Sequence, residues 1–327
     1  MKMKIFAPFG LRHEIAKRWK PWDWYKSIAV AERINPAIAD QVISDLIMLG
    51  QPALVGRIGG TESRFLGEYL KVNKLKYLSR IQFRIKHNWI KRSKEINTNA
   101  GFYFEDALQV EKFYKLYDEA LLNTDVLGAW GTAFAWIESD YSDGINSLIP
   151  VPMTAPWVDA YDPTFSSIPW SNSLNGKRVL VISPFAESIE KQHKIIKKVF
   201  PDVYYPDFIL TTIKAPQTIG FDSNSKPDWF ENLTNMKKLM SGESFDVALV
   251  AAGAYSYPLA HHAKRMGRIG IHAGGGLQLF FGILGKRWET NWGKGNYLEK
   301  YFNEFWTRPS KNETPTNANK VENGCYW

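Results

Sequence analysis

Cysteine is almost absent from this chain, and long hydrophobic runs are absent too. Cys325 is the single cysteine among 327 residues. This excludes an internal disulfide framework and a cysteine-rich metal site, and it favours a reducing cytoplasm. No apolar stretch approaches the ~18–20 residues that a membrane-spanning helix needs. Charges and a proline interrupt the amino-terminal segment, which argues against a signal peptide. We therefore expect a cytoplasmic protein.

Several standard ligand motifs are also missing. The chain has neither the GxxxxGK[ST] of P-loop proteins nor the GxGxxG of dinucleotide-binding domains. It also lacks the GxSxG nucleophile elbow found in many hydrolases. These absences weaken two candidate functions, a Rossmann-like oxidoreductase and a hydrolase.

Positive charge and tryptophan are abundant. The chain carries 41 basic and 33 acidic residues, for a net charge of +8, which favours anionic partners. Trp19, Trp22 and Trp24 lie among basic residues. That stretch could contact a membrane surface, or it could form an amphipathic helix packed on its own domain. The basic residues are spread along the chain without a nucleic-acid-reading motif, so we expect no nucleic-acid partner.

Short apolar runs bounded by glycine alternate with amphipathic stretches, which is typical of an α/β fold. We expect a Rossmann-like, mostly parallel sheet flanked by helices. The predicted strands cover 53–58, 125–130, 177–183, 203–205, 209–212, 246–251 and 269–272. The predicted helices cover 36–49, 64–71, 105–122, 188–200, 228–240, 258–266, 277–284 and 297–306, with a basic helix-and-loop excursion over 74–99.

We expect residues 1–306 to form one α/β domain, followed by a polar tail over 307–327. A lobe boundary could lie near 150–175, where the chain is rich in proline and aromatics and has no periodicity. The composition of the tail is that of a disordered segment, but its aromatic end indicates docking onto the domain. Both alternatives stay open from the sequence.

Glycines follow several predicted strands, at the end where parallel sheets bind ligands. The run Gly274–Gly276 removes every Cβ from one turn, so backbone N–H groups can face an anion at a helix start. Gly253 follows the preceding strand, and Lys286 and Arg287 come soon after. A tight turn would explain any one of these features alone. Together they predict a ligand that carries phosphate.

A second concentration of chemistry is the stretch RIGGTES. Arg57 ends a buried strand, where an unpaired charge is costly, and Glu62 follows a glycine turn. The functional interpretation is a guanidinium for a phosphate or carboxylate and a Glu for a metal or a sugar hydroxyl. The structural alternative is an Arg57–Glu62 ion pair that shapes the turn, with Glu62 as a favourable first-turn acid.

The order of these motifs resembles the GT-D-type glycosyltransferases of bacterial surface-polysaccharide assembly. An early strand ends in R-x-G-x-x-E, from Arg57 to Glu62. A KRVLVIS strand follows later, and then a D-x-x-L-x-x-x-G strand with helix, strand and glycines. The likeness covers most of residues 40–285. The family motif usually reads R-F-G-D-G-E, so Gly60 stands where the family has an Asp, and one carboxylate remains in place of two.

The resemblance implies a GT-D-like fold and transfer of a sugar from a nucleotide-sugar donor, UDP-linked in our expectation. The acceptor would be a lipid-linked glycan for capsule, O-antigen or another cell-surface polysaccharide. The protein would be peripheral at the inner face of the plasma membrane. Glu62 and Arg57 would be catalytic, and Glu62 would help hold Mn²⁺ or Mg²⁺. A non-catalytic nucleotide- or glycan-binding partner of an assembly complex is the alternative that Gly60 permits.

Within this interpretation Trp130 or Tyr255 could stack on the base, and His272 could contact phosphate or sugar. The residues predicted to bind the nucleotide sugar are Gly59, Gly60, Thr61, Trp130, Gly131, Thr132, Ser183, Gly253, Ala254, Tyr255, His272, Gly274, Gly275, Gly276, Gln278, Lys286 and Arg287.

Overall fold

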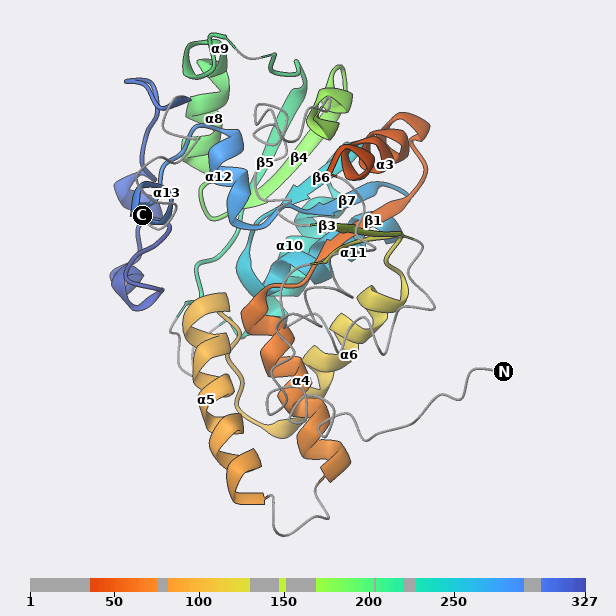
Figure 1. Ribbon diagram of the computed structural model, residues 1–327, viewed down its shortest axis with the longest axis vertical. Helices are drawn as coiled ribbons and strands as arrows, with labels where there is room; N and C mark the ends of the chain where they lie inside the picture. Colours follow the sequence, from red (N-terminus) through yellow and green to blue (C-terminus); the bar gives the residue numbers. More distant parts are fainter. Residues whose placement is uncertain are drawn as a thin grey trace.

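The computed structural model describes residues 36–75, 82–129, 147–150, 169–202, 204–219, 227–290 and 301–327. Within these ranges the chain forms a seven-stranded sheet in the order β3-β2-β1-β7-β6-β4-β5 (Figure 1). Every paired strand is parallel to its neighbour. The prediction of an α/β fold built on a parallel sheet is confirmed. The strands are β1 (Ala53–Arg57), β2 (Val126–Ala129), β3 (Ser147–Pro150), β4 (Arg178–Ser183), β5 (Ile209–Lys214), β6 (Val247–Val250) and β7 (Ile269–His272).

The central strands bury both of their faces, as their continuous apolar sequences predict. In β4, Val179 and Val181 point into one core, while Leu180 and Ile182 point into the other. β6 divides its side chains in the same way. Because successive side chains of a strand alternate in direction, one apolar run supplies both cores.

Helices cover the two faces of the sheet. One layer, packed with the first core, contains α4 (Gly60–Leu75), α5 (Gln82–Ala100), α6 (Ala107–Leu122), α10 (Trp229–Ser241) and α11 (Ser256–Arg265). The other contains α3 (Pro36–Leu49), α8 (Ala186–Lys194), α9 (Ile196–Val199), α12 (Leu277–Phe280) and α13 (Lys286–Thr290). In Figure 1, α4 and α5 run side by side away from the sheet. None of the helices in the described ranges combines the length and the apolar character of a membrane span.

Helix starts follow local sequence signals in the first layer. The side chain of Asp106 accepts a hydrogen bond from Gln109 N at 2.8 Å and caps α6. Asp228 and Glu231 form a reciprocal capping box at the start of α10. Such caps satisfy backbone donors that have no partner inside the helix.

Several helices differ from their predicted bounds. α4 begins at Gly60 and not at residue 64, so the glycine turn is itself the first helical turn. The helix predicted over 277–284 ends at Phe280, because Gly282 takes a left-handed φ of 66°. The helix predicted over 188–200 is divided at Ile195 into α8 and α9.

The predicted strand over 203–205 and the predicted helix over 297–306 are not found in the described residues. Tyr204 and Tyr205 are not in a strand, and residue 203 lies outside the described ranges. Residues 302–306 form no helix, and 297–300 are outside the described ranges. The edge strand β3 was not predicted. Residues 151–168, which make up most of the possible lobe boundary, lie outside the described ranges.

The tail over 307–327 lies against the domain. Val321 and Cys325 are each 1% exposed, which shows that the end of the tail packs against the rest of the protein. Two single-turn 3₁₀ helices, η8 (Lys311–Glu313) and η9 (Ala318–Lys320), precede this end of the tail. Strands on both sides of the region 150–175 belong to the one sheet.

Candidate functional site

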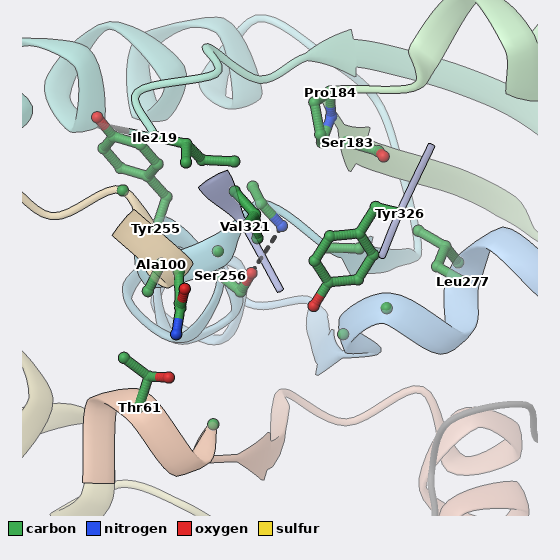
Figure 2. A pocket seen from close by; sticks show the side chains of 18 of the residues that line it. Thr61, Ala100, Ser183, Pro184, Ile219, Tyr255, Ser256, Leu277, Val321 and Tyr326 are labelled. Carbon is green, nitrogen blue, oxygen red and sulfur yellow. Dashed lines mark hydrogen bonds between the residues drawn. The ribbon is translucent and has the colours of Figure 1, made fainter. Parts of the chain in front are cut away.

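A cavity of about 310 Å³ lies at the carboxyl ends of four adjacent strands, β1, β7, β6 and β4 (Figure 2). The segment after β1 enters the first helix layer through α4, and the segment after β7 enters the second layer through α12. Adjacent strands whose outgoing chains separate to opposite faces leave a crevice between them. Ligands of open parallel sheets bind at such switch points.

The β1 side of the cavity is the glycine turn that starts α4. Gly59, Gly60, Thr61 and Glu62 all line the cavity. A Cβ placed on Gly59 would lie 2.1 Å from Oε2 of Glu62, so the carboxylate folds back against this glycine. Glu62 is 6% exposed. The first turn of α4 therefore presents two kinds of group to the cavity. One is the backbone N–H groups that have no partner inside the helix, and the other is a buried acid.

The charge of Glu62 reaches the helix layer behind it. Burial raises the pKa of Tyr117 well above its usual value, and the negative charge of Glu62 adds to that rise. Tyr117 donates a hydrogen bond to Ala254 O at 2.9 Å. A neutral phenol thus lies close to the carboxylate. Arg57 ends β1 in register with Gly128, but its side chain is outside the described part of the structure.

The glycine turns after β6 and β7 also line the cavity, but packing explains part of their composition. Gly253 has a φ of 54°, and a Cβ there would lie 2.6 Å from Ala100 O at the end of α5. Gly274 has a φ of 62°. A Cβ on Gly275 would lie 2.9 Å from the ring of Tyr326. The missing side chains therefore admit other parts of the chain as well as a ligand.

Two further predicted residues line the cavity with little exposure. Ser183 is 2% exposed, and its hydroxyl accepts a hydrogen bond from Phe185 N at 3.2 Å. His272 is 6% exposed and lies with its ring centre 6.1 Å from that of Tyr257.

Gln278 offers an unused acceptor on the same wall. Its Nε2 donates to Tyr326 O at 2.8 Å, while its buried Oε1 accepts no hydrogen bond from any described residue. Gln278 is 3% exposed and lines the cavity. A buried acceptor without a donor is costly, so a ligand hydroxyl or N–H would stabilise this wall.

Tyr255 does not favour the stacking role that we predicted for it. One face of its ring stacks on Trp229, with centroids 4.6 Å apart and planes 7° apart. It is 1% exposed, and burial raises its pKa. Ala254 is fully buried and is not among the cavity-lining residues. Trp130, Gly131 and Thr132 lie outside the described ranges.

Of the two basic residues predicted to bind the ligand, Lys286 and Arg287, only Arg287 lines the cavity. Its Nη2 donates to Glu322, while Nη1 donates to the Tyr326 hydroxyl at 3.3 Å. Lys286 is not a lining residue, and its Nζ donates to Asn323 O at 3.2 Å on the exposed side.

Three stretches that sequence reasoning missed complete the walls. The end of α5 contributes Asn99, Ala100 and Gly101, and the segment after β5 contributes residues 216–219. The tail contributes Val321, Glu322, Tyr326 and Trp327. In Figure 2 the ring of Tyr326 lies between Val321 and Leu277. The aromatic end of the tail was the available signal, but nothing in it indicated where it would dock.

The described residues build no metal site by themselves. No group of three or more His, Cys, Asp or Glu side chains converges among them. Glu62 and Glu322 are the carboxylates that line the cavity within the described ranges. A divalent cation at Glu62 would therefore need phosphate oxygens and water to complete its ligands, as is common for Mg²⁺.

Comparisons of the chain with known protein families, with curated proteins and with solved structures found no match.

Proposed function

We propose that the protein is a glycosyltransferase that moves a sugar from a nucleotide-sugar donor, UDP-linked in our reading, to a lipid-linked glycan acceptor for a cell-surface polysaccharide. The observation that carries this proposal is the meeting of distant turns in one cavity. The turn at Gly59, the turn at Gly253 and the run Gly274–Gly276 line it together with Arg287. Backbone N–H groups at a helix start, joined by a guanidinium, suit a diphosphate.

The GT-D resemblance adds the reaction. The bond between the anomeric carbon and the diphosphate breaks, and the diphosphate leaves with the electron pair. The acceptor oxygen bonds to the anomeric carbon and gives its proton to a base. Arg287 and the N–H groups of the first turn of α4 would stabilise the departing charge. Glu62 is the carboxylate that we assign as base or as cation ligand, and Arg57 keeps its proposed phosphate role. A divalent cation, if bound, would supply further charge neutralisation at the diphosphate.

The test of this proposal is a donor panel. The purified protein should show a raised melting temperature with one of the UDP-, GDP-, CDP- or CMP-linked sugars and should hydrolyse or transfer that sugar. No shift and no turnover with any donor, with and without Mn²⁺ or Mg²⁺, would count decisively against the proposal.

A non-catalytic binding partner is the second candidate, because Gly60 leaves the first turn of α4 with Glu62 as its one acid. The variant Glu62→Gln separates the two functions. An enzyme should lose roughly 10²- to 10⁴-fold in turnover, the usual contribution of a general base, while a binder has no turnover to lose. Glu231→Gln is the matched control, since Glu231 is also a first-turn acid of a helix but lies away from the cavity.

We also propose peripheral contact with the inner face of a membrane, where a lipid-linked acceptor would reside. Residues 69–94 contain no Asp or Glu. Their basic residues are Lys71, Lys74, Lys76, Arg80, Arg84, Lys86, Lys91, Arg92 and Lys94. On the described part of α5, His87, Ile90, Lys91 and Lys94 are exposed at helical spacing, and Ile90 is 48% exposed. A basic helix face with an exposed apolar residue suits an anionic lipid surface.

A further inference from the structure

We name residues 321–327 the C-terminal segment; its members Val321, Glu322, Tyr326 and Trp327 line one side of the cavity. Arg287 N donates to Cys325 O at 2.9 Å, and Lys286 N donates to Trp327 O at 3.3 Å. A Cβ on Gly285 would lie 2.8 Å from backbone atoms of Cys325 and Tyr326. The segment is therefore held by main-chain contacts at the start of α13, next to the side chain of Arg287.

Arg287 is the cation that this segment engages. Its guanidinium carbon lies 4.6 Å from the centre of the Tyr326 ring, and Nη2 lies 3.3 Å from Sγ of Cys325. The charged partner is Glu322, which forms a salt bridge with Nη2. The side chain of Arg287 is 23% exposed and that of Glu322 is 49% exposed. Since both residues line the cavity, this ion pair can be reached by a ligand.

An exposed carboxylate is a weak partner for a guanidinium. Ion pairs with a solvent-exposed member contribute little to stability, because water and salt screen the attraction. A phosphate carries more charge and can accept two parallel N–H bonds from one guanidinium. A diphosphate that enters the cavity would therefore compete successfully with Glu322 for Arg287.

The backbone around Glu322 forms a left-handed turn. Glu322 and Asn323 have φ values of 44° and 59°, and they are the non-glycine residues with positive φ in the described ranges. Gly324 follows with 79°. Release of Arg287 by Glu322 needs only a rotation of the Glu322 side chain, which leaves these φ values unchanged.

We propose that Glu322 occupies the place of the anionic ligand at Arg287, and that a diphosphate displaces it. Glu322 thereby sets the affinity and selectivity of the cavity: it holds the guanidinium in position in the absence of ligand and opposes weakly charged anions. This inference rests on the proposed function for its ligand class, a diphosphate-bearing nucleotide, but its probe is inorganic pyrophosphate.

The test compares pyrophosphate binding by the full chain and by Glu322→Gln in calorimetry. We expect the variant to bind about 3- to 10-fold more tightly, because the competing charge is gone. A merely structural role for Glu322 would weaken binding. Arg287→Gln should abolish binding in both backgrounds, with folding of each variant checked by thermal unfolding.

Glu289→Gln is the matched control. Glu289 forms a salt bridge with Arg308, and neither residue lines the cavity. Glu289→Gln removes the same negative charge as Glu322→Gln, but away from the cavity. We expect this variant to bind pyrophosphate within about twofold of the parent. Equal gains for both variants, unchanged or weaker binding by Glu322→Gln, or no pyrophosphate binding by any of them would each overturn the inference. If the gain is seen but no nucleotide sugar is bound or turned over, the inference stands and the proposed glycosyltransferase falls.

Should Glu322→Gln fail to fold, Glu322→Asp provides the test. It keeps the charge but shortens the side chain, which weakens its hold on Arg287. We expect tighter pyrophosphate binding than the parent, and binding equal to or weaker than the parent would contradict the inference.

Discussion

Single residues in this chain serve two needs at once, and its glycines illustrate this best. Gly253 and Gly275 line a cavity, and each also makes room for another part of the protein, Ala100 O and the Tyr326 ring. Gly270, inside β7, only makes room for another part of the protein, since a Cβ there would lie 1.9 Å from Ala260 O of α11. A glycine in the sequence predicts close approach, but it does not say whether a ligand or the chain itself approaches.

His261 gives a residue-scale prediction about pH. Burial is the main cause that lowers its pKa to about 4; Glu119 opposes the shift, and Arg265, Lys237 and Lys264 contribute to it. As the pH falls, His261 therefore binds a proton near pH 6.5 in the unfolded chain but only near pH 4 in the folded chain. The contribution of neutral His261 to the free energy of unfolding is complete above the unfolded pKa, and it is lost as the pH falls from that value toward the folded pKa.

We expect His261→Gln to remove up to about 3 kcal/mol of the acid-induced loss of stability. Urea unfolding between neutral and mildly acidic pH measures it. His87→Gln, which removes an exposed histidine, is the control variant. A parent protein whose stability does not fall in this window would contradict the assignment.

At the scale of elements, α8 depends on a remote cap. Its N-cap residue, Phe185, makes no side-chain capping bond. The carboxylate of Glu313 accepts from Glu187 N at 2.9 Å and from Ser188 N at 3.2 Å instead. Glu313 is 1% exposed, and its carbonyl oxygen accepts from Trp327 Nε1 at 2.8 Å. One residue thus ties the helix start to the tail.

We expect Glu313→Ala to lower the free energy of unfolding by about 2–4 kcal/mol, because the variant loses a cap and leaves buried donors unsatisfied. Asp228→Ala, which removes the local cap of α10, is the matched control and should cost about 1 kcal/mol. Urea unfolding measures both variants. Limited proteolysis should cut the tail of Glu313→Ala first, and equal losses for the two variants would refute the long-range role.

On the scale of the whole molecule, the hairpin of α4 and α5 connects the cavity to a basic surface. Gly60 begins α4 and Ala100 ends α5, and both line the cavity, while the hairpin extends away from the sheet (Figure 1). The exposed face of α5 carries Lys91 and Lys94. Under the proposed function, a membrane bound along this face would bring a lipid-linked acceptor to the hairpin whose other end lines the cavity.

We expect the protein to bind vesicles of phosphatidylcholine mixed with phosphatidylglycerol and to dissociate from them at high salt. It should not bind vesicles of pure phosphatidylcholine. Lys91→Gln with Lys94→Gln should weaken binding roughly 10- to 30-fold, at about 1 kcal/mol per lysine. Lys194→Gln with Lys197→Gln changes the net charge equally on the opposite helix layer and should have a small effect. Cosedimentation measures this, and equal losses for the two pairs would reject the α5 face.

Local sequence patterns are enough to predict the class of fold and the positions of most strands. Apolar runs such as β4, with side chains alternating between two cores, need no distant information to be recognised. The same local signals placed Gly59, Gly253 and Gly274–Gly276 at strand ends, and a parallel sheet must bring those ends to one edge.

The other segments that complete the cavity could not be predicted in this way, because tertiary packing brings them there. The end of α5, residues 216–219 and the C-terminal segment reach it through contacts between parts of the chain that are far apart in sequence. Arg287 meets Glu322 across 35 residues, and Glu313 caps a helix 126 residues away. Side-chain pairing at such separations follows from how the layers pack. No periodicity or local motif encodes it, which is why the sequence suggested a cation for the site but not the carboxylate that holds it.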